Sequence, residues 1–232
     1  INLCYSEHAR RYILDTGVKP EYTFVVGSPM AEVLDGCKAQ IDNSSILNTL
    51  GLDQGKYILL SAHREENIDI EENFFSLMNA VNAMAEKYDM PILYSCHPRS
   101  KKYIEQRGFV FDRRVIRHEP LGFFDYNKLQ QNAFCVVSDS GTLPEEGAYF
   151  RFPAVSVRTS TERPEAMENG IFTVGCITTE QVLQAVALAT SMHADGDYGA
   201  AVCAYCDTCV SAKVVKLIQS YTGIINKMVW RK

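Results

Sequence analysis

Residues 138–146, with the sequence SDSGTLPEE, have the composition of a phosphate-binding helix start. They follow an apolar run that predicts a strand, and their last residues predict a helix. Gly141 lets a ligand approach the backbone closely, while Ser140 and Thr142 add hydroxyl donors. Free N–H groups and the helix dipole at such a position favour a phosphate. The alternative interpretation is a capping box between Thr142 and Glu145, and one helix start can serve both purposes.

A second group of polar residues, His63 and Arg64 followed by EEN, comes directly after the apolar run at residues 57–62. A histidine at the end of a strand can donate to a phosphate or transfer a proton near neutral pH. Arg64 can pair with a neighbouring glutamate or with a phosphate. The alternative is a solvated loop histidine without a chemical role.

Three further segments carry candidate residues. Arg163, in the charged segment 158–165, can contact a diphosphate oxygen, although an ordinary surface loop with internal ion pairs also fits. His97 follows another apolar run. Phe124 lies in residues 120–126, where adjacent aromatic side chains could hold a base or simply belong to the core.

Short apolar runs alternate with helix-like segments along most of the chain, which predicts βαβ units and an α/β fold with a mainly parallel sheet. Ligands then bind at the carboxyl ends of the strands, in the loops named above. The expected strands are residues 22–26, 57–62, 91–96, 114–118, 133–138, 154–157 and 172–175, and the expected helices are 6–17, 30–37, 70–88, 101–106, 125–131, 145–150, 179–192 and an amphipathic helix from 214 to 229.

Composition excludes several classes of protein. The chain has 232 residues, 47% of them hydrophobic, and a net charge of −5, so we expect no binding of nucleic acid. No apolar stretch suggests a membrane span or a signal peptide, and the cytoplasm is the default compartment. Cys203, Cys206 and Cys209 have an iron–sulfur-like spacing but lack a fourth cysteine. We therefore expect a variable loop there, with no metal and no cofactor.

Four strings together resemble the non-hydrolysing UDP-N-acetylglucosamine 2-epimerases: SAHREEN at residues 61–67, HPR at 97–99, SDSGTLPEE at 138–146 and TERPE at 161–165. The resemblance implies a Rossmann-like parallel sheet, forming the C-terminal half of a two-domain architecture like that of glycosyltransferase B enzymes. Residues 1–25 would be a remnant of the N-terminal domain and linker, residues 26–210 the UDP-binding domain, and residues 211–232 a crossing helix.

The same resemblance assigns roles to individual residues. By this resemblance, Ser140, Gly141, Thr142 and Arg163 contact the diphosphate, and Glu146 binds the ribose hydroxyls. Phe124 lies on the uracil side, and His63 helps UDP leave. Arg64 and His97 would belong to a site for an activating UDP-sugar.

The implied reaction inverts C2 of a UDP-2-acetamido sugar by eliminating UDP and adding it back. The acid and base carboxylates belong to the N-terminal domain, so we expect this chain alone to be inactive and the full-length protein to be a homodimer. HREEN, GFFDYNKLQ and the tail are closer to a capsule and O-antigen branch that acts on 6-deoxy sugars, and we rank that substrate level with UDP-N-acetylglucosamine. A glycosyltransferase of the same layout and a UDP-sugar binding module are the alternatives.

Overall fold

The computed structural model describes residues 1–232, and the chain forms two compact units. The larger unit is Cys37–Ala200, and the smaller unit combines Ile1–Gly36 with Ala201–Lys232. Each unit contains a parallel sheet.

The larger unit is built on a six-stranded parallel sheet with the order β5-β4-β3-β6-β7-β8. The chain enters the middle of the sheet at β3, moves outward to β5, and returns to place β6 on the other side of β3. This is the strand order of a doubly wound Rossmann sheet, so the predicted fold class is confirmed. The strands are β3 (Ile58–Ser61), β4 (Ile92–Ser95), β5 (Val115–His118), β6 (Cys135–Ser138), β7 (Ala154–Ser156) and β8 (Thr173–Val174).

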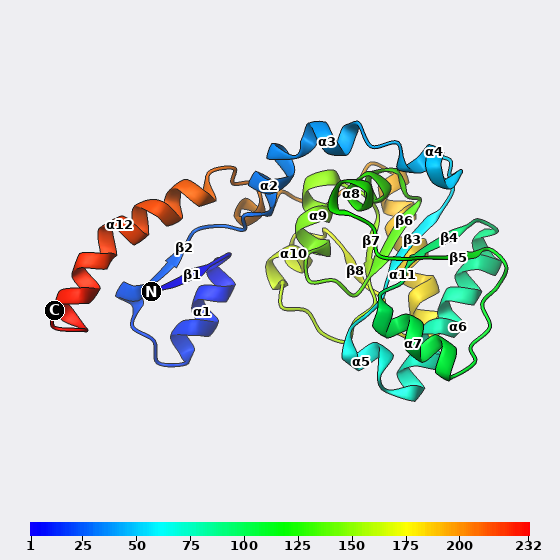
Figure 1. Cartoon of the computed structure of the whole chain (residues 1–232), viewed down its shortest axis with the longest axis horizontal. Coiled ribbons are helices and arrows are strands. Elements are labelled where there is room, and N and C mark those ends of the chain that lie inside the picture. The colour runs from blue at the N-terminus through cyan, green and yellow to red at the C-terminus, as the bar shows by residue number, and fades with distance from the viewer. The chain divides into compact units, whose positions relative to one another are not determined.

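Helices cover both faces of this sheet (Figure 1). Ile58 and Leu60 pack into a core cluster with α6 and α11 on one face. Side chains alternate along a strand, so Leu59 points to the opposite face, where it is equally buried. On that face the hydroxyl of Tyr57 donates to the carbonyl of Leu129 in α8 at 2.6 Å. The helices are α3 (Lys38–Asp42), α4 (Ile46–Leu50), α5 (Glu65–Ile68), α6 (Glu71–Tyr88), α7 (Pro98–Gln106), α8 (Phe123–Asn132), α9 (Leu143–Phe150), α10 (Pro164–Glu168) and α11 (Thr179–Ala194).

The smaller unit pairs two short parallel strands and ends in a long amphipathic helix. Phe24 of β2 packs edge-on against Tyr221 of the last helix, with ring centroids 5.0 Å apart. The unit consists of β1 (Asn2–Cys4), α1 (Glu7–Asp15), the 3-10 helix η1 (Pro20–Tyr22), β2 (Thr23–Val25), α2 (Met30–Gly36), the 3-10 helix η2 (Cys203–Tyr205) and α12 (Val210–Met228). None of the chain's helices combines the length and apolar character that crossing a membrane would require.

The expected strands and long helices are all present, while four short helices were not predicted. α3 and α4 precede β3, α5 follows it, and α10 lies in the charged segment after β7. Helices of four or five residues are too short to show a hydrophobic period, and they are marginal without tertiary contacts. The ordinary surface loop considered for residues 158–165 is therefore wrong in part, because α10 begins within that segment. His63 lies before α5 and outside any helix.

Candidate functional site

The candidate residues lie at the topological switch point of the sheet, between β3 and β6, where successive strands are added on opposite sides. Ser61 and Ser138 are register partners at the carboxyl ends of these two strands. The segments that follow the two strands diverge to helices on opposite faces of the sheet, which leaves a crevice at this point in α/β proteins. Burial raises the pKa of Tyr126 in α8, and its interactions with Ser61 and Ser138 partly offset that effect.

The turn after β3 is held by a buried carboxylate from the turn after β6. Oδ2 of Asp139 accepts hydrogen bonds from the backbone N–H groups of His63 and Arg64, both at 2.8 Å, and from Nδ2 of Asn67 at 3.2 Å. Nδ2 of Asn67 also donates to the carbonyl of Val157 at 2.8 Å, beyond β7. Helix α5 is thereby anchored at its N-terminal end to the two neighbouring strands.

The other end of α5 is anchored by two arginines, Arg99 in α7 and Arg107 directly after it. Arg107 donates to the carbonyls of Ile68 and Asp69, both at 2.7 Å. Arg99 forms a bidentate pair with Asp69 at 2.9 and 2.7 Å and a third bond to Glu65 at 2.7 Å. Hydrogen bonds to Asp69 first, and then to Glu65, raise the pKa of Arg99. Side chains rather than helical propensity therefore fix this turn.

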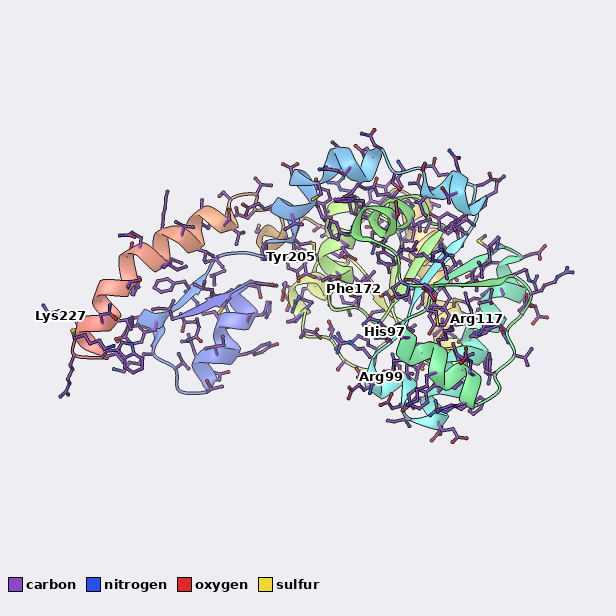
Figure 2. All side chains as sticks on the ribbon, in the orientation of Figure 1. His97, Arg99, Arg117, Phe172, Tyr205 and Lys227 are labelled. Atoms are coloured by element: carbon purple, nitrogen blue, oxygen red, sulfur yellow. The ribbon has the colours of Figure 1, made fainter.

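His63 and His97 lie together although 34 positions separate their numbers. Their ring centroids are 5.8 Å apart. His97 caps α7, because its Nδ1 accepts from the backbone N–H of Arg99 at 3.2 Å. Figure 2 labels His97 and Arg99 at this end of the sheet. The structure thus brings two of the histidines singled out in the sequence to one place.

The start of α9 does not form the capping box. Thr142 is already in the helical region, with φ −90° and ψ −11°, and its side chain makes no capping bond. Its hydroxyl instead lies 3.0 Å from Oγ of Ser140 and donates to Oε1 of Glu146 at 3.0 Å. The capping interpretation was wrong because an N-cap needs a non-helical backbone, which Thr142 does not have. The hydroxyls of Ser140 and Thr142 form a short polar row that leads to Glu146.

Glu146 is a buried carboxylate with partners on both oxygens. Its residue exposure is 6%, and Oε2 accepts from Nε2 of Gln130 at 2.6 Å. Burial raises its pKa, whereas the bonds from Gln130 and Thr142 lower it. Each carboxylate oxygen has two acceptor sites, so both oxygens can still accept a hydrogen bond from a ligand.

Arg163 forms an ion pair with a second buried glutamate of α9. Its Nε lies 3.2 Å from Oε1 of Glu145, whose side chain is 2% exposed. Burial raises the pKa of Glu145, and the charge of Arg163 partly offsets that effect. Arg163 therefore stands at the N-terminus of α10 and is oriented toward α9.

Glu162 bridges two arginines beside the glycine of the candidate phosphate site. Its Oε2 lies 2.7 Å from NH1 of Arg158, which is 8% exposed, and its Oε1 lies 3.4 Å from NH2 of Arg64. A Cβ atom at Gly141 would lie 3.1 Å from the same Oε1. Burial alone would raise the pKa of Glu162, but its own backbone N–H group, Arg158 and Arg64 together lower it. A carboxylate thus occupies the surroundings of Gly141 between two cations.

Phe124 lies at the first turn of α8 and is 42% exposed, and the adjacent Phe123 is 40% exposed. Their rings meet edge to face with centroids 6.0 Å apart. These exposures show that neither aromatic side chain belongs to the core, which was the alternative interpretation. The pair offers an accessible apolar surface at the first turn of the helix that carries Gln130.

The cysteines of residues 203–209 do not converge on one point. Cys206 contacts the carbonyl of Val202 at 3.3 Å, and Cys209 contacts Asp207 at 3.1 Å. No cluster of histidine, cysteine or acidic residues in the chain has the arrangement of a metal site. Part of the expected loop is the 3-10 helix η2.

Comparison with known proteins places the chain in a family. A family model described as UDP-N-acetylglucosamine 2-epimerase matches residues 1–219. The chain belongs to the UDP-N-acetylglucosamine 2-epimerase family. The UDP-N-acetylglucosamine 2-epimerase of Methanocaldococcus jannaschii is 30% identical over 192 residues, which are 79% of this chain and 52% of that protein. The Bacillus subtilis enzyme of the same name is 28% identical over 82% of this chain and 48% of its own length.

Solved structures of family members share the fold. A structure of UDP-N-acetylglucosamine 2-epimerase from Rickettsia bellii is 36% identical, has a TM-score of 0.89, and covers 100% of this chain and 62% of its own chain. The Methanocaldococcus jannaschii enzyme in complex with UDP-N-acetylglucosamine and UDP is 24% identical with a TM-score of 0.81. The chain spans about half the length of the curated family members that it matches.

Sequence reasoning missed two residues of this candidate site. Asp139 stands between the serines of the SDSG string, and its sequence position suggested only one more small polar residue. Arg158 was seen as part of a charged cluster, but nothing in its type or spacing separated it from its exposed neighbours. Its position directly after the apolar run of β7 was the signal that could have marked it.

Proposed function

We propose that this chain binds the UDP moiety of a UDP-2-acetamido sugar at the crevice between β3 and β6. We further propose that it is the UDP-binding, C-terminal half of a UDP-sugar 2-epimerase. One observation carries the proposal: four kinds of group lie together at the switch point of the sheet. They are the hydroxyls of Ser140 and Thr142, the buried carboxylate of Glu146, Arg163 and His63. The family membership and the 36% identical Rickettsia bellii epimerase support it.

Each predicted residue has a role in this proposal. The diphosphate lies over Ser140, Gly141 and Thr142 at the start of α9, and Arg163 contacts it from α10. The two ribose hydroxyls donate to Glu146, while the uracil ring lies against Phe124. Arg64 and His97 form the part of the crevice in which a second, activating UDP-sugar binds.

The reaction proceeds by elimination and re-addition of UDP. A base removes the proton from C2 as the bond between C1 and the diphosphate oxygen breaks, which gives a 2-acetamidoglycal and UDP. UDP then adds back to C1 while C2 receives a proton on its other face. His63 stabilises the departing diphosphate by donating a hydrogen bond, and the acid and base that act on C2 come from the remainder of the protein. The full-length protein acts as a cytoplasmic homodimer.

The activity is tested by hydrogen exchange at C2. Full-length protein is incubated in heavy water with UDP-N-acetylglucosamine and, separately, with its 6-deoxy relative, without any sugar acceptor. We expect deuterium at C2 of at least one substrate and none when the 232-residue chain is used alone. Turnover that requires an acceptor would instead identify a glycosyltransferase, and UDP binding without exchange would identify a binding module.

The position of Glu162 leads to a prediction about affinity. The carboxylate lies beside Gly141 and between two arginines, so a bound diphosphate meets a like charge there. We expect Glu162→Gln to tighten binding of UDP and of pyrophosphate about three- to tenfold, which corresponds to roughly 0.6–1.4 kcal/mol. Calorimetry measures this, with Glu72→Gln on the exposed surface of α6 as a control for net charge. Unchanged or weaker binding would show that Glu162 does not oppose the ligand.

A further inference from the structure

Asp139 is the most deeply placed acidic residue of the crevice, with no exposed surface. It follows β6 directly, where it stands between the two strands of the switch point. One of its oxygens, Oδ2, is fully engaged by the N-terminal end of α5, since it accepts from His63 N, Arg64 N and the Asn67 side chain. These bonds fix the plane of the carboxylate and therefore the direction of its second oxygen.

The second oxygen faces the imidazole of His63. Oδ1 of Asp139 lies 3.2 Å from Nδ1 of His63, and it accepts no hydrogen bond of good geometry in the present ring orientation. A buried carboxylate oxygen without a donor is costly, and an N–H group at Nδ1 of His63 is a donor within reach. The side chain of His63 is 43% exposed, so its ring has room for the small rotation that would complete this bond.

We propose that Asp139 is a positioning residue for His63: it holds the imidazole in place and keeps its proton on Nδ1. Neutral imidazole carries a proton on only one nitrogen, so Nε2 is left as an acceptor. Once Nε2 has taken up a proton from water, it can donate the hydrogen bond to the departing diphosphate. The role of His63 toward the diphosphate rests on the proposed function. The geometry of Asp139 and His63 does not depend on it.

The neighbouring histidine provides an internal reference. Nδ1 of His97 accepts a hydrogen bond from Arg99 N, so the neutral His97 ring carries its proton on Nε2. Two rings 5.8 Å apart are thus expected in opposite tautomers. This contrast can be observed in one spectrum without substrate.

The test is nitrogen-15 NMR of the histidine rings in the 232-residue chain, recorded on the neutral imidazoles. His63→Gln and His97→Gln variants assign the signals. We expect the Nδ1–H tautomer for His63 and the Nε2–H tautomer for His97. In Asp139→Asn the amide oxygen can still accept from the backbone N–H groups of His63 and Arg64, and its NH2 group then faces Nδ1, which switches His63 to the Nε2–H tautomer. Asp69→Asn, with the same change of charge, leaves His63 unchanged.

The Nε2–H tautomer for His63 in the wild-type chain would overturn the proposal, even if Asp139→Asn failed to fold. A switch in tautomer should also lower the rate of C2 exchange in the full-length protein at least tenfold with less than a twofold change in UDP affinity. An unaltered exchange rate after the switch would remove the positioning role. Failure of UDP to bind the wild-type protein would instead count against the proposed function and leave the tautomer result standing.

Discussion

Replacing Glu146 by Gln is expected to weaken UDP binding ten- to a hundredfold without loss of the fold. A charged hydrogen-bond partner of the ribose contributes about 1.5–3 kcal/mol, and this is the interaction that the substitution removes. The fold should tolerate Gln, because Gln130 has an unsatisfied side-chain oxygen and can turn its amide to accept from the new NH2 group. Thr142 can still donate to the remaining oxygen.

The effect on stability should depend on pH. Burial raises the folded-state pKa of Glu146 above its ordinary value of 4.5, so the folded state holds this proton more tightly than the unfolded state. Stability from this group is present below the ordinary value and is lost as the pH rises through the raised value. Gln does not titrate, so Glu146→Gln should gain stability relative to wild type as the pH rises above 4.5.

Calorimetry with three ligands separates the contributions to affinity. Glu146→Gln should lower the affinity for uridine by the same factor as the affinity for UDP, and should change the affinity for pyrophosphate little. Glu86→Gln, on the exposed face of α6, is the control and should bind all three ligands as wild type does. Equal UDP affinity in wild type and Glu146→Gln would remove Glu146 from the site.

Arg163→Ala is expected to have a large effect on both stability and binding. It leaves the carboxylate of Glu145 buried without its cation, which costs about 3–5 kcal/mol for a fully buried pair and roughly 2–3 kcal/mol here, where Arg163 is partly exposed. The pKa of Glu145 is already raised by burial and rises further without Arg163. The destabilisation is therefore small in acid and grows as the pH rises through that raised pKa.

A second substitution distinguishes the two effects of Arg163. In Arg163→Ala with Glu145→Gln, the buried charge is gone, so the midpoint of urea unfolding near pH 8 should return toward the wild-type value. UDP affinity should stay at least tenfold below wild type, because the diphosphate contact is still missing. Recovery of UDP affinity in the double variant would mean that Arg163 acts only by pairing with Glu145.

The sequence predicted the sheet and the main helices because their signals are local. The apolar runs of β3, β4 and β6 and the hydrophobic period of α6 are visible in short windows. Those windows also place His63 and Ser140 at strand ends, which is where a Rossmann sheet binds its ligands. The general position of the site could therefore be predicted from the sequence.

The sequence could not predict the contacts that organise the site, because these join distant segments. Asp139 holds His63 across 76 positions, Arg107 holds the end of α5 across 39, and Glu162 reaches Arg64 across 98. Short helices such as α5 depend on these bonds, so they could not be predicted from the sequence either. The capping box failed for a related reason: its residue types were right, but the backbone of Thr142 was already helical.

A crystal structure of the chain with bound UDP tests the central claim most directly. We predict that the diphosphate lies within hydrogen-bond distance of Ser140, Gly141 and Thr142, that both ribose hydroxyls donate to Glu146, and that the Glu162 carboxylate has moved away from Gly141. UDP bound elsewhere on the sheet, or with its ribose away from Glu146, would contradict the account.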